Sequence, residues 1–292
     1  MEFPEIINFR ISSKCNNNCK FCYFNSKENL KELNFDELKK LFNLFYKKGV
    51  KAIVLCGGEP MLRNDFEKIV KELKKYNFKI FLDNNGDFFF KYSDTILKNI
   101  DIIGLPIDFY HKSYRNSDNF CNVIKVLDFL KEKPAKPLIR IGTVVTKENI
   151  GELKKIGDLI KNYPINMWKI YEFISVNDTN SIKNQSSLKL PLKTFEKVTR
   201  RLKSEFSSYF KVMISKREDR ANAYFLINPD GSVFLPVDNL IQCKDVVIGN
   251  VFDKDIYKKW KKFVKMENYI KNSVETFNYR FENADNEEIK SE

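Results

Sequence analysis

Apolar strand patterns alternate with amphipathic helix patterns six times in about the first 175 residues, and this alternation constrains the fold more than any other feature. Runs rich in β-branched and aromatic residues predict strands at 6–12, 51–55, 78–82, 101–107, 138–145 and 167–174. Residues at helical spacing predict helices between them, the first lying between Asn34 as N-cap and Gly49 as stop signal. Such alternation is typical of βα units and a parallel sheet. Six units are too few for a closed eightfold barrel, so we expect an α/β fold, a partial (β/α)6 barrel of the TIM type.

The residues after the sixth strand predict a smaller unit of different character. Residues 176–190 are polar and aperiodic, which favours a loop or lid. A helix at 191–207, a strand at 210–214, a hairpin turning at 228–231, a strand at 246–248 and a helix at 255–266 then predict an α+β extension. The expected organisation is a core over 1–175, the polar loop, an extension over 191–268 and a flexible tail over 269–292.

The composition excludes several classes of protein. The 292 residues are 43% hydrophobic, enough for a large core, but no apolar run approaches the roughly 18–20 residues that span a bilayer. We see no signal peptide, and six cysteines with three clustered do not form a secreted disulfide framework, so we expect a cytoplasmic protein without a membrane partner. His111 is the single histidine, which excludes His-rich zinc sites and favours a loop role for that residue.

The net charge of +12 favours anionic partners. The lysines are spread over most of the expected helices and do not form one stripe with interleaved aromatic residues. We therefore interpret the charge as a solvated surface and do not expect nucleic acid as a partner.

Three cysteines follow the first expected strand in the pattern C-x3-C-x2-C: Cys15, Cys19 and Cys22. No fourth cysteine follows at ligand spacing, although a closed zinc site or an iron–sulfur cubane with only protein ligands needs four. Three thiols therefore indicate a metal centre with one open coordination position, as in catalytic sites. Unrelated buried thiols, or a zinc site with a distant fourth ligand, remain alternatives at this point.

A second motif, Gly57-Gly58-Glu59-Pro60, follows the second expected strand, and Phe21 precedes the third cysteine. Together with C-x3-C-x2-C after the first strand, this order resembles the radical S-adenosylmethionine (radical SAM) superfamily over about residues 5–175. The resemblance implies a [4Fe–4S] cluster held by the three cysteines, with SAM chelating the fourth iron. It also implies an enzyme that cleaves SAM reductively to a 5′-deoxyadenosyl radical, which abstracts hydrogen from a substrate.

The resemblance further implies which residues bind SAM, while the catalytic residues stay unassigned. Thr143 and Asn149 are weaker candidates for the ribose, and Cys56 and Cys121 are interpreted as packing residues. Non-functional interpretations also exist: a turn at Asn85, a helix cap at Asp108 and a solvated arginine at Arg115. The expected SAM-binding residues are Gly57, Gly58, Glu59, Pro60, Asn85, Asp108 and Arg115.

The C-terminal part resembles the SPASM or twitch extension of peptide-modifying relatives, but Cys243 is its only cysteine, so it builds no auxiliary cluster. The stretches 140–149 and 168–169 also resemble viperin-like nucleotide dehydratases. The resemblance therefore implies a nucleotide substrate, with a peptide or protein partner as the alternative and an RNA-binding iron–sulfur module as a third. A flavodoxin or ferredoxin is the implied electron donor. The cations expected to hold a triphosphate are Lys147, Lys169, Lys216, Arg217 and Arg220.

Overall fold

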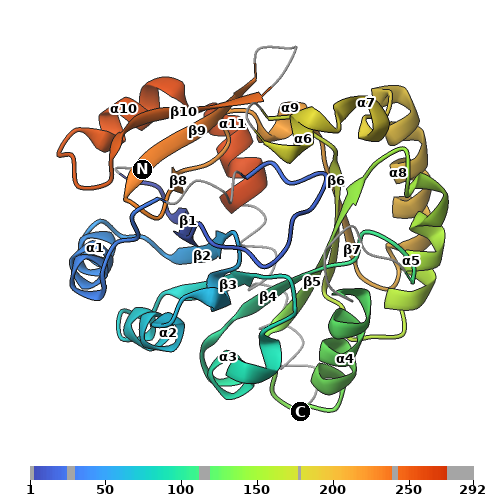
Figure 1. Ribbon diagram of the computed structural model, residues 1–292, viewed down its shortest axis with the longest axis horizontal. Coiled ribbons are helices and arrows are strands. Elements are labelled where there is room, and N and C mark those ends of the chain that lie inside the picture. Colours follow the sequence, from blue (N-terminus) through green and yellow to red (C-terminus); the bar gives the residue numbers. More distant parts are fainter. Residues whose placement is uncertain (1–2, 25–29, 112–118, 177–178, 239–242, 275–292) are drawn as a thin grey trace.

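One open sheet organises the protein (Figure 1). The computed structural model describes residues 3–24, 30–111, 119–176, 179–238 and 243–274. Over these residues the strand order is β10-β9-β8-β1-β2-β3-β4-β5-β6-β7, so the sheet ends at β10 and β7 and does not close. The strands are β1 (Ile6–Ser12), β2 (Ala52–Gly57), β3 (Lys79–Asp83), β4 (Ile102–Pro106), β5 (Leu138–Val145), β6 (Met167–Glu172), β7 (Lys211–Ser215), β8 (Leu226–Ile227), β9 (Ser232–Asp238) and β10 (Cys243–Asn250).

Strands β1 to β7 are parallel, and each pairs with the next along the chain. The predicted partial barrel is confirmed, and helix α8 (Leu192–Phe206) with β7 adds one parallel unit beyond the six expected. Strand β8 pairs in parallel with the free edge of β1, and β9 and β10 continue the sheet as antiparallel strands. The extension therefore prolongs the sheet of the core.

Helices cover the outer face of the barrel because their apolar stripes pack on the sheet (Figure 1). In α1 the side chain of Asn34 accepts hydrogen bonds from the N–H groups of Asp36 and Glu37, and the Glu37 carboxylate accepts one from the Asn34 N–H. This capping box fixes the start of the helix, as the sequence predicted. The covering helices are α1 (Phe35–Lys47), α2 (Phe66–Lys74), α3 (Ser93–Asn99), α4 (Asn119–Lys131), α5 (Leu153–Ile160) and α8.

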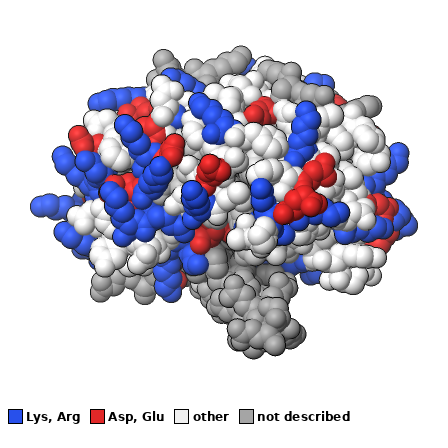
Figure 2. All heavy atoms as spheres, turned by 90° about the horizontal axis from the view of Figure 1, so that it is seen from below, with Lys and Arg blue, Asp and Glu red and all other residues white. Residues whose placement is uncertain are grey.

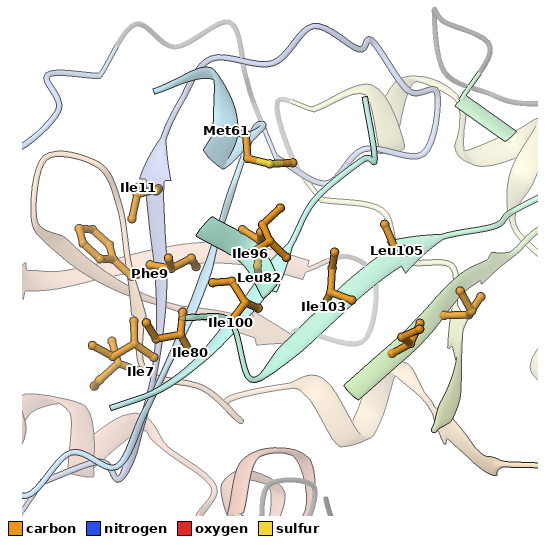
Figure 3. Packing of buried hydrophobic residues seen from close by; sticks show 14 of the residues in the cluster. Ile7, Phe9, Ile11, Met61, Ile80, Leu82, Ile96, Ile100, Ile103 and Leu105 are labelled. Carbon is orange, nitrogen blue, oxygen red and sulfur yellow. The ribbon is translucent and has the colours of Figure 1, made fainter. Parts of the chain in front are cut away.

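Alternation along β1 separates the core from the interior of the barrel. Ile7, Phe9 and Ile11 are completely buried and pack in the main core, where Figure 3 shows them beside residues of β3, β4 and α3. The side chains between them, Asn8 and Arg10, line the inner cavity. Because successive side chains of a strand point to opposite faces, one strand supplies both the core and the site.

The segment expected as a loop or lid contains two short helices, α6 (Asn180–Lys183) and α7 (Gln185–Leu188). The side chain of Thr179 caps α6 by accepting a hydrogen bond from the Ser181 N–H, and Ser181 and Leu188 are completely buried. Polar composition suggested a loop here, but several of these polar side chains make local hydrogen bonds that cap and join the two helices.

The C-terminal helices pack against the extension and the start of β1. Helix α10 (Ile256–Phe263) leads to α11 (Met266–Tyr269), and a π-helical turn (Ile270–Val274) follows. The hydroxyl of Tyr269 is completely buried and accepts a hydrogen bond from the Ile6 N–H at 3.0 Å. Residues 269–274 thus form the end of α11 and a π-helical turn at the start of the segment for which a flexible tail was expected, and residues 275–292 lie outside the described residues. None of the described helices is long and apolar enough to cross a membrane.

Candidate active site

A cavity of about 380 Å³ occupies the interior of the barrel. Each strand from β1 to β6 contributes lining residues. Gly104 on β4 leaves the room that the Asp83 and Arg140 side chains occupy, since a Cβ there would lie 2.2 Å from a carboxylate oxygen of Asp83. The mouth is formed by the loops after the strands, where ligands bind in parallel βα folds. The three predicted metal ligands, Cys15, Cys19 and Cys22, all line it.

Two neighbouring segments hold the cysteine loop from opposite sides. On the β3 side, the Asn85 amide donates to the Asn16 side chain at 2.8 Å, and Asn16 donates to Asp87 at 2.7 Å. On the other side, the Asn180 amide of α6 donates to Asn18 at 2.6 Å and to the Cys19 carbonyl at 3.2 Å. The run of asparagines between the cysteines therefore fixes the loop through hydrogen bonds.

The Gly57-Gly58 pair crosses the cysteine loop at very short distance. The Gly58 N–H donates to the Ser12 carbonyl at 3.0 Å. A Cβ atom on Gly57 would lie 2.4 Å from the Ser12 carbonyl oxygen, and one on Gly58 would lie 2.2 Å from the Lys14 carbonyl oxygen. Both glycines line the cavity, but the atoms that exclude a side chain belong to the backbone of residues 12–14. Glycine is required here so that the two motifs can touch.

Glu59 ties the glycine turn to the end of β3. Its carboxylate is completely buried and accepts hydrogen bonds from the Met61 N–H at 3.1 Å and the Asn85 N–H at 2.8 Å. Glu59 and Pro60 are buried and are not among the residues that line the cavity. Their predicted contact with SAM stays a prediction.

Of the other expected SAM ligands, Asn85 and Asp108 line the cavity. One carboxylate oxygen of Asp108 accepts a hydrogen bond from the Val144 N–H at 2.9 Å. The weaker candidates, Thr143 and Asn149, are buried and hydrogen-bond to the backbone of the segment after β4. The Thr143 hydroxyl donates to the Ile107 carbonyl at 2.6 Å, and the Asn149 amide donates to the Asp108 carbonyl at 2.7 Å. Arg115 lies outside the described residues.

His111 is exposed and does not line the cavity. It adopts a left-handed backbone conformation with φ of 60°, and its ring packs edge-on against Phe120. These features agree with its interpretation as a loop residue.

Three comparisons with known proteins assign the chain. A family model described as the radical SAM superfamily matches residues 9–160, more than half of the chain. The chain belongs to the radical SAM superfamily. Its GTP 3′,8-cyclase relative from Aquifex aeolicus (strain VF5) is 24% identical over 79% of this chain and 72% of that protein. The S-adenosylmethionine-dependent nucleotide dehydratase of Flammeovirga pacifica is also 24% identical, over 78% of this chain and 81% of that protein.

Solved radical SAM structures share the fold. Streptococcus suis SuiB bound to S-adenosylmethionine superposes with a TM-score of 0.70 at 15% identity, covering 92% of this chain and 67% of that one. The enzyme anSMEcpe with bound AdoMet and the Kp18Cys peptide gives a TM-score of 0.68 at 18% identity, covering 90% of this chain and 83% of that one. The partial barrel and its open sheet are therefore common to this chain and these structures.

Radical SAM enzymes use a [4Fe–4S] cluster and SAM, and the donor set of this chain fits the cluster. Among the described residues no group of His, Cys, Asp and Glu side chains surrounds a single ion. A cubane does not need such a group, because each thiolate binds a different iron at a separate corner. Cys15, Cys19 and Cys22 would hold the cluster, and the Asn17 N–H donates a hydrogen bond to the Cys15 sulfur at 3.4 Å. When bound, the cluster supplies the electron that cleaves SAM.

The cavity of this radical SAM protein carries strong charges that the sequence motifs did not reveal. Arg140 and Asp83 form a hydrogen-bonded ion pair, and the side chain of Arg140 is only 13% exposed. Burial opposes the charge of Arg140, but the Asp83 carboxylate together with Tyr171 and Tyr224 holds the pKa of the guanidinium above its usual range. Arg10 pairs with Asp245 at 3.5 Å and lies 4.2 Å from the ring centroid of Phe234.

Three tyrosines and one cysteine also line the cavity. Burial raises the pKa of Tyr224, and it raises the pKa of the Cys56 thiol to about 12. Half of the Tyr23 surface is exposed, and this side chain lines the cavity. Lys169 and Arg220 approach the Tyr171 ring at 5.3 and 5.7 Å. The sequence carried a signal for Lys169 and Tyr171, because alternation along β6 places these two residues on the same face of the sheet, and that face lines the cavity.

Proposed function

We propose that this radical SAM enzyme abstracts hydrogen from a nucleotide bound in the barrel cavity. The observation that carries the proposal is the group of basic and aromatic side chains in the lining: Arg10, Arg140, Lys169, Arg217 and Arg220 with Tyr23, Tyr171 and Tyr224. Arginine binds phosphate oxygens through two parallel hydrogen bonds, and tyrosine rings stack on nucleobases. Two relatives named above act on nucleotides.

The hydrogen bonds of these arginines, in addition to their charge, support phosphate binding. The Nε of Arg140 is buried and has no hydrogen-bond partner among the described residues. Arg220 donates to the Glu172 carbonyl, and the Arg217 N–H donates to the Glu172 carboxylate at 2.7 Å, so Glu172 positions both arginines. A phosphate is an acceptor of hydrogen bonds, so it would supply the kind of partner that the Nε of Arg140 lacks among the described residues.

Two of the expected phosphate ligands lie elsewhere. Lys147 lies outside the cavity lining and donates to the Ser186 carbonyl at 2.9 Å. Lys216 is paired with Glu196 at 2.5 Å and also lies outside the lining. The proposed phosphate site therefore rests on cations of β1, β5, β6 and α9 (Arg217–Arg220).

The direct test is anaerobic reconstitution of the enzyme, followed by incubation with SAM, dithionite and single nucleoside triphosphates. We expect one triphosphate to be consumed while 5′-deoxyadenosine forms well above the level without substrate. Replacing Arg220→Ala should raise the KM for that nucleotide by about 10-fold or more, because a charge-assisted contact is lost. Arg201→Ala on the exposed face of α8 is the matched control. Equal 5′-deoxyadenosine with and without every triphosphate would reject the proposal.

A peptide substrate is the second candidate, and the free edge of the sheet supports it. Strand β10 pairs only with β9 among the described strands, and Val247 on it is 59% exposed. An extended peptide can add to such an edge through backbone hydrogen bonds. Formation of 5′-deoxyadenosine that depends on a peptide and not on nucleotides would favour this candidate.

Membership of an enzyme superfamily sets aside the alternative of an RNA-binding module without catalysis.

A further inference from the structure

Buried polar groups without partners, rather than surface charge, indicate a further site. On the face that Figure 2 shows, Lys and Arg side chains are scattered with Asp and Glu side chains between them. Within the described part of the chain, three buried side-chain atoms have no hydrogen-bond partner: the Nε of Arg140 and the hydroxyl oxygens of Ser215 and Ser273. Arg140 and Ser273 line the cavity, whereas Ser215 is not among the lining residues. A buried polar group without a partner lowers stability, so the place of Ser273 on the cavity indicates that a ligand supplies its partner.

Ser273 lies in the π-helical turn (Ile270–Val274) that follows α11, and it is only 6% exposed. A buried hydroxyl in an α-helix commonly donates to the carbonyl four residues earlier, as the Thr199 hydroxyl of α8 does to the Phe195 carbonyl at 2.8 Å. The π-helical turn interrupts this register, and the Ser273 hydroxyl makes no such bond to a described residue. Turns of this kind are rare and frequently lie at functional sites. The turn therefore leaves the hydroxyl available for another partner.

The preceding residue, Asn272, presents a hydrogen-bond acceptor at the same place. It is buried and lines the cavity. Its amide nitrogen donates to the Asp219 carbonyl at 2.6 Å and to the Asn268 carbonyl at 3.0 Å, so both of its N–H groups are used. The remaining polar atom of the side chain, Oδ1, can only accept a hydrogen bond. Asn272 and Ser273 together therefore offer one acceptor and one hydroxyl that both donates and accepts.

Side chains of α11 and of the π-helical turn attach this segment to α9. The Asn268 amide donates to the carbonyl oxygens of Glu218 and Ala221, both at 3.0 Å. Lys271 pairs with the Asp219 carboxylate at 2.8 Å. Helix α9 also carries the two arginines proposed above to bind phosphate, and both of these line the cavity. The uncharged polar pair and the phosphate-binding cations are thus held in one hydrogen-bonded unit.

We propose that Asn272 and Ser273 form a recognition subsite for an uncharged polar group of the nucleotide, a hydroxyl or an amino group. A phosphate oxygen has no hydrogen to donate to Oδ1 of Asn272, so this subsite does not extend the phosphate site. A ribose hydroxyl, or the amino edge of a base with its neighbouring ring nitrogen, can donate to Oδ1 and accept from the Ser273 hydroxyl. The inference rests on the proposed nucleotide substrate and adds residues that select it.

The test uses the full reconstituted chain with SAM and measures the Kd of each nucleoside triphosphate by equilibrium dialysis. We expect Ser273→Ala to raise the Kd of the preferred triphosphate by about 3- to 10-fold, because one neutral hydrogen bond is lost. The thermal unfolding temperature without nucleotide should not fall, because the hydroxyl has no partner to lose in the protein alone. A merely structural serine would instead lower the unfolding temperature and leave the Kd unchanged.

Nucleotide analogues distinguish the two sources of the bound group. If the base supplies it, UTP in place of CTP, or inosine triphosphate in place of ATP, should bind more weakly to the unchanged enzyme. If the ribose supplies it, the 2′-deoxy or the 3′-deoxy analogue should do so. In either case Ser273→Ala should lose most of the discrimination between the two ligands, as expected for groups in direct contact. If no analogue binds more weakly than its parent, the proposal is overturned.

Ser215→Ala is the matched control, because it removes the same kind of buried hydroxyl from a residue outside the cavity lining. Its Kd values should equal those of the unchanged enzyme, and an equal rise in this control would overturn the proposal. If the unchanged enzyme binds no triphosphate, the proposed function and this inference are both rejected. If it binds one and Ser273→Ala binds it equally well, only this inference is rejected.

Discussion

Replacing Gly58→Ala tests whether the two sequence motifs form one rigid unit. The added Cβ would lie 2.2 Å from the Lys14 carbonyl oxygen and 3.0 Å from the Cys15 Cβ. Ordinary contact begins at 3.4 Å, so the backbones must separate by about 1.2 Å (3.4 minus 2.2) at a residue that directly precedes a cluster ligand. Steric insertion of this kind costs about 1–3 kcal/mol.

The displacement should affect the cluster more than the fold. A shift of about 1 Å at a catalytic group reduces rates by about 100-fold. We therefore expect Gly58→Ala to bind less iron and sulfide on reconstitution and to form 5′-deoxyadenosine at least about 100-fold more slowly. The thermal unfolding temperature should fall by only a few degrees.

Gly151→Ala is the matched control, because no atom lies within 4 Å of its added Cβ. This variant should keep its full iron content and rate. If Gly58→Ala showed the same iron content and rate as the control, the close crossing of the two motifs would have no functional consequence, and the reasoning would be refuted.

Three further outcomes follow from contacts described above. Cys19→Ala should abolish 5′-deoxyadenosine formation and remove most reconstituted iron; full SAM cleavage by this variant would contradict the cluster assignment. Tyr269→Phe leaves the Ile6 N–H without its partner and should lower the free energy of unfolding by about 1–3 kcal/mol in urea titrations. Because burial raises the pKa of Cys56 from 9.0 to about 12, only the unfolded chain ionises this thiol between these values. Stability should therefore fall as the pH rises above about 9, and Cys56→Ala should reduce this loss.

Regular patterns predicted the fold well, because each strand and helix of the barrel has its own local signal. The N-cap at Asn34 and the strand at 138–145 were both predicted from the sequence and are found at those positions. The helices α6 and α7 were missed because four-residue elements carry no periodicity. The seventh parallel strand was assigned to the extension, since only pairing with β6 shows that it continues the barrel.

The candidate cluster ligands could be found in the sequence because three cysteines share one short motif, whereas the residues of the substrate side share none. Asp83, Tyr171 and Tyr224 come from three separate segments, and no short motif connects them. The Gly57-Gly58 pair was expected to bind SAM, which stays a prediction, and the structure shows in addition that it makes room for the backbone of the cysteine loop. Contacts between distant segments are set by tertiary packing, which a single sequence does not record.

The position of β1 in the middle of the sheet has a consequence for how the chain is made. One edge of β1 pairs with β2 soon after synthesis, but the other pairs with β8, whose first residue follows the last residue of β2 by 169 positions (226 minus 57). At about 5–20 residues per second, the ribosome needs roughly 10–30 s to supply that partner. During this time an apolar strand has an open edge, which is the kind of surface that templates aggregation. Chaperone dependence during translation, rather than stability after it, is the expected weakness of this architecture.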